Sequence, residues 1–187
     1  MQLSAKMVRE RLAHMKPRLT NCSLETSRKG QNAVGELMRA VHHGQVRVKH
    51  HDFENFEGAW VLPDDPRRDG TILYLHGGGY TCGGLEYALG FGAALADECG
   101  AKVFCAAYRL APEFPFPAAV EDAAQAYEYL LKKGYAPEKI SLCGESAGGG
   151  LCFALCLYLR QQGLPLPGSI VAISPWTDLT FSGESFE

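Results

Sequence analysis

Short apolar runs alternate with longer amphipathic segments from Thr71 onward, and this alternation limits the possible folds more than any other feature of the chain. Each short run is long enough for one buried strand, and each longer segment carries apolar residues at helical spacing. Alternating strands and helices are typical of a parallel sheet covered by helices, so the sequence predicts an α/β fold with a mostly parallel sheet. The predicted strands are 72–75, 103–107, 140–143 and 170–173, and the predicted helices are 87–99, 117–133 and 151–162.

The first 45 residues have a different pattern. Apolar residues recur there at helical spacing in two groups, which predicts two helices separated by a break near residues 17–30. Beyond them Val46 and Val48 alternate with polar residues, and the apolar run 59–62 precedes Pro63, so two early strands are expected. The two helical groups are Leu3, Met7, Val8, Leu12 and Met15, and then Ala33, Val34, Leu37, Met38 and Val41.

Length and charge restrict the classes of partner. A chain of 187 residues is long enough for one domain, and 18 basic against 21 acidic side chains give a net charge of −3. This balance does not favour a nucleic-acid or membrane partner, so a small molecule is expected. Charged residues interrupt the N-terminal apolar ones, and no apolar run reaches membrane-spanning length, so we expect a cytoplasmic protein. Seven cysteines without Cys-x-x-Cys spacing predict neither disulfides nor a metal site.

A serine flanked by glycines is the main candidate for chemistry. Gly144-x-Ser146-x-Gly148 lies between a predicted strand and a predicted helix. A serine on such a sharp turn projects its hydroxyl above the carboxyl edge of the sheet, where it can act as a nucleophile. Glycine is needed on both sides because a Cβ would collide with the neighbouring strand or helix. The alternative is a glycine-rich turn in which the serine is incidental.

A second glycine-rich segment, His76-Gly77-Gly78-Gly79-Tyr80, follows the predicted strand 72–75. Its bare backbone can approach a substrate closely enough for amide groups to bind a developing oxyanion. The amide of Ala147, at the start of the helix after Ser146, would be a further donor and would benefit from the helix dipole. A phosphate-binding loop is the alternative, but neither nucleotide-binding glycine pattern fits, so no nucleotide cofactor is expected.

These segments, together with three others, closely resemble the hormone-sensitive-lipase branch of the α/β-hydrolases over roughly residues 46–187. The resemblance implies hydrolysis of a carboxylic ester through an acyl-enzyme on Ser146, without cofactor or metal. It also implies that the oxyanion donors are Gly78 with Gly77 or Gly79, and Ala147. Residues 1–45 then correspond to an N-terminal helical cap segment, and residues 46–187 to a hydrolase core. The other three segments are 108–113 (YRLAPE), 116–119 (FPAA) and 174–179 (SPWTDL).

The histidines depart from the family pattern. Hydrolases of this fold carry nucleophile, acid and histidine in that chain order, but all six histidines of this sequence precede Ser146. The resemblance implies that His76 shapes the oxyanion loop, that Asp178 is structural, and that the catalytic aspartate and histidine belong to a later segment. His76 as a substitute base and Asp178 as the triad acid stay open as alternatives. The other histidines are His14, His42, His43, His50 and His51, and Arg109 and Glu113 are expected to fix the loop after strand 103–107.

The sequence therefore predicts a hydrolase fold that is incomplete at its C-terminus. Strand 170–173 would then be an edge open to self-association. The first hypothesis is a serine esterase of small-molecule esters whose activity is impaired in this chain, because the acid and base are absent. The alternative is a non-catalytic ligand-binding or interaction module, and a weaker one is a histidine supplied by another chain.

Overall fold

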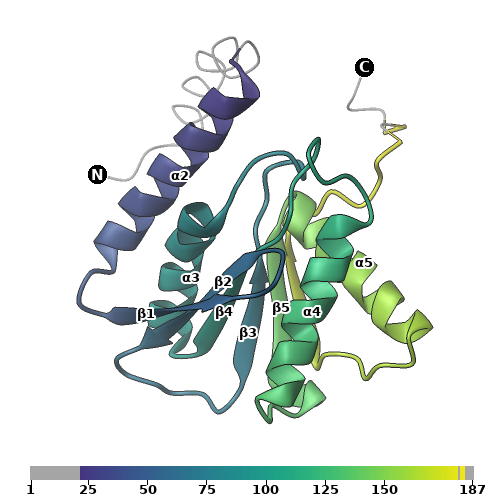
Figure 1. The fold of residues 1–187 in the computed structure, drawn as a ribbon. Coiled ribbons are helices and arrows are strands. Elements are labelled where there is room, and N and C mark those ends of the chain that lie inside the picture. Colours follow the sequence, from purple (N-terminus) through teal and green to yellow (C-terminus); the bar gives the residue numbers. More distant parts are fainter. Residues whose placement is uncertain (1–21, 181, 184–187) are drawn as a thin grey trace.

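The computed structural model describes residues 22–180 and 182–183, so the helix expected around residues 3–15 lies outside the described residues. The described elements alternate as the sequence predicts from Thr71 onward (Figure 1). The strands are β1 (Val46–Asp52), β2 (Glu57–Pro63), β3 (Thr71–Leu75), β4 (Lys102–Ala107), β5 (Ile140–Glu145) and β6 (Ser169–Ile173). The helices are α2 (Leu24–Val41), α3 (Leu85–Cys99), α4 (Ala118–Lys132), the 3-10 turn η1 (Pro137–Lys139) and α5 (Ala147–Gln161).

The strands form one six-stranded sheet in the order β1-β2-β4-β3-β5-β6. β4, β3, β5 and β6 are parallel, while β1 and β2 join as antiparallel strands at one side. In the parallel part, Leu75 of β3 is in register with Gly144 of β5. The carboxyl ends of β3 and β5 therefore meet at the same edge, and this arrangement confirms the mostly parallel α/β fold.

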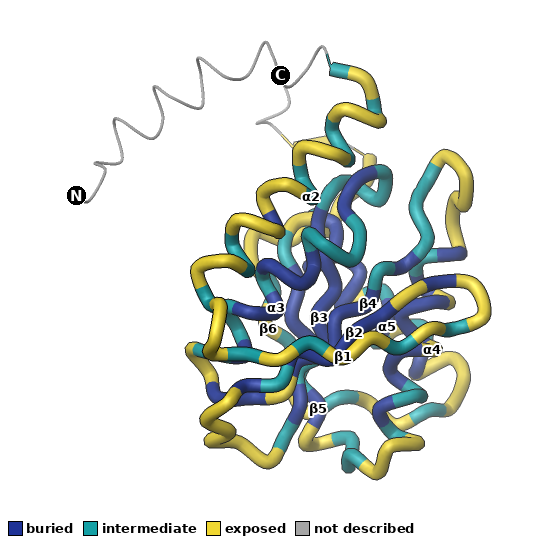
Figure 2. Tube along the Cα trace, turned by 60° about the vertical axis from the view of Figure 1, so that its left-hand side comes forward, coloured by how far each residue is buried: buried dark blue, intermediate teal, exposed yellow. Residues whose placement is uncertain are grey.

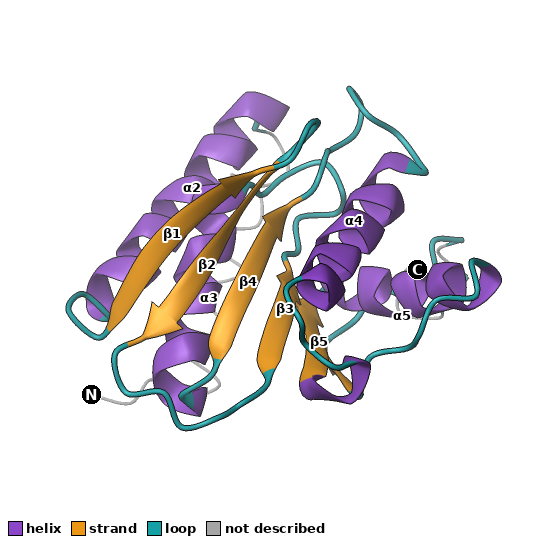
Figure 3. Cartoon of the chain, turned by 60° about the horizontal axis from the view of Figure 1, so that its bottom comes forward, coloured by secondary structure: helices purple, strands orange, loops and turns teal. Residues whose placement is uncertain are grey.

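Helices cover both faces of the sheet, with α3 on one side and α4 and α5 on the other (Figure 3). Alternate residues of β4 face the two cores: Phe104 packs with the residues of α4 and α5, and Cys105 with those of α3. The central strands are buried and the outer helix faces are exposed (Figure 2). β6 forms an edge of the sheet, where Val171 and Ile173 are exposed.

Helix α2 lies outside α3 and corrects one prediction. The break was expected to extend to residue 30, but α2 begins at Leu24 because the Ser23 hydroxyl accepts a hydrogen bond from the amide of Thr26 (3.2 Å). Gly30 is therefore an internal helical residue. Val34, Leu37 and Val41 are exposed and do not face α3, so the outward side of α2 is apolar.

Helices α2 and α3 meet instead at two glycines. A Cβ on Gly35 would overlap the backbone of Glu86 and Tyr87, and a Cβ on Gly90 would lie 2.5 Å from the carbonyl oxygen of Gly35. The two backbones thus touch directly. Two polar contacts accompany this one: an ion pair between Arg39 and Glu86 (2.9 Å), and a hydrogen bond between His42 Nδ1 and Asp97 Oδ2 (2.7 Å). Within the described residues, no helix is long and apolar enough to cross a bilayer.

Candidate active site

Ser146 is the single residue between β5 and α5, which begins four residues earlier than its apolar run predicts. Its backbone angles are φ 54° and ψ −120°, a combination that side-chain-bearing residues rarely adopt. Such a conformation costs on the order of 1–3 kcal/mol and persists only where the surrounding structure enforces it. The residue is exposed at the amino end of α5. The strained turn therefore presents the hydroxyl to solvent beside a helix N-terminus.

The glycines next to Ser146 are required by close backbone approach. A Cβ on Gly144 would lie 2.5 Å from the backbone of Gly148, and a Cβ on Gly148 would overlap the carbonyl oxygens of Leu75 and His76. The first turn of α5 therefore rests directly on the end of β3. The sequence predicts that a Cβ at either position would collide with its neighbours, and the close backbone contact agrees with this. The same contact brings the serine turn against the His76–Tyr80 loop.

The amides of that loop differ in their partners. The Gly77 amide donates to Glu145 Oε1 (2.5 Å). Gly78 and Gly79 have φ values of 119° and 64°, the region that favours glycine. Across the described part of the chain, the amides of Gly78, Gly79 and Ala147 donate to no acceptor. These three amides are therefore free to bind a ligand, whereas the Gly77 amide is engaged.

His76 is held inside the loop. Its side chain is fully buried (0% exposed), its ring stacks on Tyr108 at 4.3 Å between centroids, and its Nδ1 donates to the carbonyl of Gly77 (2.8 Å). Burial lowers the pKa of His76 to about 4. The Tyr108 hydroxyl donates to the carbonyl of His76 (2.5 Å). His76 is thus a neutral side chain that packs the loop, as the resemblance implies.

Glu145 is a site residue that the sequence reasoning missed. Its Oε2 accepts a hydrogen bond from the Tyr74 hydroxyl (2.6 Å), while its Oε1 accepts from the Gly77 amide. Burial raises the pKa of Glu145, and the hydrogen bonds from Tyr74 and Gly77 oppose this rise. Glu145, which directly precedes Ser146, thereby joins the serine turn to the loop after β3. Its only signal in the sequence was an acidic residue at the variable position of Gly144-x-Ser146.

The segment after β6 holds the serine turn from the other side. The Ser146 amide donates to the carbonyl of Ile173 (3.0 Å), and the Trp176 amide donates to the carbonyl of Ser146 (2.8 Å). Asp178, farther along, accepts from the amide and hydroxyl of Thr180 and from Ser182. The hydrogen bonds from Thr180 lower the pKa of this exposed carboxyl. Asp178 therefore closes a local turn.

Two arginines fix the loop after β4, and one of them was not predicted. Arg109 donates to Asp122, which is buried (1% exposed), through Nη2 (2.7 Å) and Nε (3.0 Å). Arg28 of α2 pairs with Glu113 (2.7 Å) and also donates to the carbonyls of Thr81 (2.7 Å) and Ala111. As expected, Arg109 and Glu113 are scaffold charges. Arg28 connects Glu113 to α2, 85 residues away in the chain.

The remaining histidines lie elsewhere. His42 pairs with Asp97, and His51 stacks on Tyr129 (4.2 Å between centroids). Between residues 22 and 180, no histidine is hydrogen-bonded to Ser146 or Asp178. His14 is outside the described residues. In the same described region, no group of three or more His, Cys, Asp or Glu side chains is arranged to hold a metal ion.

Comparison with known proteins gives matches over most of the chain. A family model described as alpha/beta hydrolase fold matches residues 72–187. The chain is 50% identical over 127 residues to an acetyl-hydrolase of Streptomyces hygroscopicus, covering 67% of this chain and 42% of that protein. It is 37% identical over 125 residues to human hormone-sensitive lipase, covering 64% of this chain and 12% of the lipase. The chain thus spans less than half the length of these curated relatives.

Solved structures are similar as well. A hormone-sensitive lipase from a metagenome library superposes with a TM-score of 0.83 at 36% identity, covering 96% of this chain and 61% of that one. A crystal structure of EstE5, soaked with p-nitrophenyl butyrate, superposes with a TM-score of 0.77 at 38% identity, covering 88% and 55% of the two chains.

Proposed function

Since the chain belongs to the α/β-hydrolase family, on its hormone-sensitive-lipase-like branch, we propose that it carries the nucleophile and oxyanion donors of an esterase for small-molecule carboxylic esters. The observation that carries this proposal is the strained, exposed turn at Ser146, packed against a loop with free amides. The names of the relatives, acetyl-hydrolase and esterase among them, support the class of substrate.

In the proposed reaction the Ser146 Oγ attacks the acyl carbon of the ester. The carbonyl double bond opens, and the new oxyanion accepts hydrogen bonds from the amides of Gly78, Gly79 and Ala147. The tetrahedral intermediate collapses, the alcohol leaves with the proton of the serine hydroxyl, and an acyl-enzyme ester remains. Water then attacks this ester, and the acid is released with Ser146 restored.

Gly78 and Gly79 are the better pair of loop donors, because the Gly77 amide is already bonded to Glu145. Glu145 would hold the loop at the correct distance from the nucleophile, and the dipole of α5 would favour negative charge beside Ala147. We also propose that α2 forms part of a cap, since Arg28 ties it to the carbonyl of Thr81, next to the oxyanion loop.

A serine hydroxyl needs a base, and the family order places that histidine after the nucleophile. His76 is unsuited to the role because it is buried and its Nδ1 is bonded to Gly77. We therefore propose that these 187 residues alone turn over ester slowly, at roughly 10³–10⁴ times the uncatalysed rate. Acylation of Ser146 should still be detectable, since the oxyanion donors do not depend on the base.

The test is acylation of the purified chain by p-nitrophenyl butyrate, followed by intact mass and peptide mapping. We expect one butyryl group on Ser146 and a slow release of p-nitrophenol. Ser146→Ala should abolish the adduct. Ser141→Ala should leave it unchanged, because Ser141, at the other end of β5, bonds to Ser169. Saturable ester binding without any adduct would overturn the proposal in favour of a non-catalytic binding module.

A further inference from the structure

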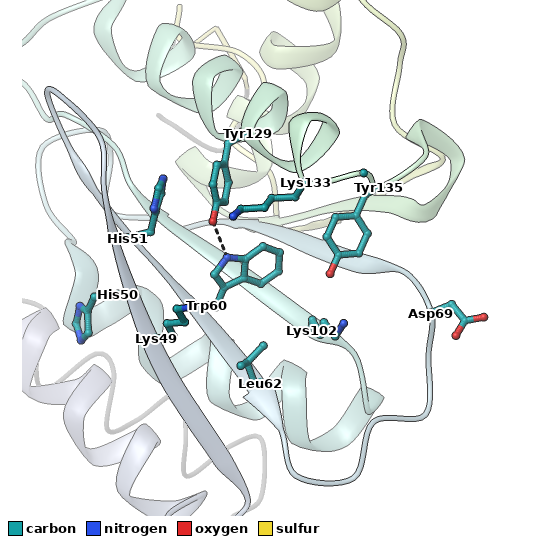
Figure 4. A pocket seen from close by; sticks show the side chains of 11 residues that line it. Lys49, His50, His51, Trp60, Leu62, Asp69, Lys102, Tyr129, Lys133 and Tyr135 are labelled. Atoms are coloured by element: carbon teal, nitrogen blue, oxygen red, sulfur yellow. Dashed lines mark hydrogen bonds between the residues drawn. The ribbon is translucent and has the colours of Figure 1, made fainter.

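A groove of about 670 Å³ lies on the α4 face of the sheet, above β1 and β2 (Figure 4). It is near the amino end of β4, since Lys102 begins that strand, whereas Ser146 follows the carboxyl end of β5. The two sites are therefore at opposite edges of the sheet. Pockets of about 300–1,000 Å³ are of the size that holds small organic ligands.

Aromatic rings form the floor and one wall of this groove. The Trp60 indole is 8% exposed, and its Nε1 donates to the Tyr129 hydroxyl (3.0 Å), drawn as the dashed line in Figure 4. The ring of Tyr135 lies 5.9 Å from that of Trp60, inclined by 30°. Because Trp60 is buried and its indole donor is already satisfied, the accessible part of the floor is the ring surface of the half-buried Tyr129 and Tyr135. Such a surface suits a flat, aromatic ligand.

Ammonium groups surround the aromatic floor. Lys49 comes from β1, Lys102 from β4, and Lys133 from the end of α4, with its Nζ 5.3 Å from the centre of the Tyr129 ring. None of the three forms a salt bridge with a described residue. Asp69 is the one carboxylate among the described residues that line the groove, on the loop at its outer end (Figure 4). In a protein of net charge −3, this is a local excess of unpaired positive charge.

We propose that this groove is a binding site for a small aromatic anion, such as an aromatic carboxylate. The ring of the ligand would pack on Tyr129 and Tyr135, beside the edge of Trp60, and its negative group would lie among Lys49, Lys102 and Lys133. Binding would relieve the mutual repulsion of the ammonium groups and remove aromatic surface from water. The site is independent of the reaction at Ser146, so its test needs no catalytic activity.

The test uses the indole N–H signals of the ¹⁵N-labelled chain, which has two tryptophans. Trp176→Phe assigns the Trp60 signal. The ligands are sodium 2-naphthoate and its neutral analogue 2-naphthamide. We expect a saturable shift of the Trp60 signal with 2-naphthoate at a Kd of about 1 mM or below. The amide should bind at least about fivefold more weakly, because it lacks the charge.

Paired lysine variants separate the groove from general surface charge. Lys102→Gln with Lys133→Gln should weaken 2-naphthoate binding about tenfold. The matched control, Lys132→Gln with Lys139→Gln, removes the same charge from lysines outside the groove and should change binding less than about twofold. Equal losses in both double variants would overturn the assignment. So would equal binding of the amide, the absence of a saturable shift, or a shift of Trp176 alone, which would place the ligand near the serine.

Discussion

Two glycines of α2 should respond to alanine in opposite directions. A methyl group added at Gly30 would meet no heavy atom within 4 Å beyond its own helix, whereas a Cβ on Gly35 would lie 2.7 Å from the carbonyl carbon of Glu86 and closer still to its oxygen. Both residues are internal to the same helix, so the change in helix propensity is similar. Their comparison therefore isolates the contact between α2 and α3.

The magnitudes follow from these surroundings. Gly30→Ala should stabilise the chain by about 0.5–1 kcal/mol, because alanine loses less backbone entropy than glycine in a helix. Gly35→Ala gains the same amount but forces α2 away from α3 by roughly 1 Å, and such overpacking costs about 1–3 kcal/mol. The net effect of Gly35→Ala is a loss of about 1–2 kcal/mol. The two variants should differ by about 2 kcal/mol, or roughly 4–8 °C in Tm.

The assay is thermal and urea unfolding of the wild type and both variants, followed by circular dichroism. A decrease of the urea midpoint without a change in slope would indicate a loss of stability with the folded state retained. If Gly35→Ala raised Tm as much as Gly30→Ala, the direct backbone contact between α2 and α3 would be refuted. If α2 instead detached, the slope would fall and the far-ultraviolet signal would lose one helix.

Three further perturbations concern the site and its support. Gly148→Ala should reduce stability by about 3 kcal/mol or more, because its methyl group would overlap the backbone at the end of β3. The hydrogen bond from Arg28 lowers the pKa of Glu113 to about 2, so the stabilisation by this pair is present above pH 4.5 and is lost as the pH falls toward 2. Asp122→Asn should cost about 1.5–3 kcal/mol, because it leaves the partly exposed Arg109 guanidinium without its buried counter-charge.

Each of these has a result that would contradict it. Wild-type Tm for Gly148→Ala would contradict the close approach of α5 and β3. In urea unfolding between about pH 2 and 5, Arg28→Gln should flatten the pH dependence, and an unchanged profile would refute the role of the pair. Glu121→Gln removes a more exposed carboxylate 3.6 Å from Arg109, and should change stability by less than about 0.5 kcal/mol. A loss equal to that of Asp122→Asn would contradict the buried pair.

The sequence predicted the elements after Thr71 well because their apolar periodicity is determined by burial in the sheet. The strand and helix on either side of Ser146 were predicted for the same reason, and so was the need for Gly144 and Gly148. Which face of α2 packs on α3 was harder to predict. Its contact with α3 uses Gly35, which has no side chain, so reasoning from apolar residues pointed to the face that is exposed.

Glu145 and Arg28 were missed because their partners are distant in the chain. Glu145 bonds to Gly77, 68 residues earlier, and Arg28 bonds to Glu113, 85 residues later. A charged residue beside a motif or on a helix has the same pattern whether it is solvated or bonded across the fold. Only the register of β3 with β5, and the docking of α2, bring these groups together.

The position of Arg28 limits how an ester could reach Ser146 in the proposed reaction. Its guanidinium holds the carbonyls of Thr81 and Ala111 and the carboxylate of Glu113 at the same time. If α2 swung outward as a lid, all of these bonds would break in one step, together with the glycine contact to α3. Access to the serine turn is therefore expected through motion of other segments, while α2 remains a fixed wall.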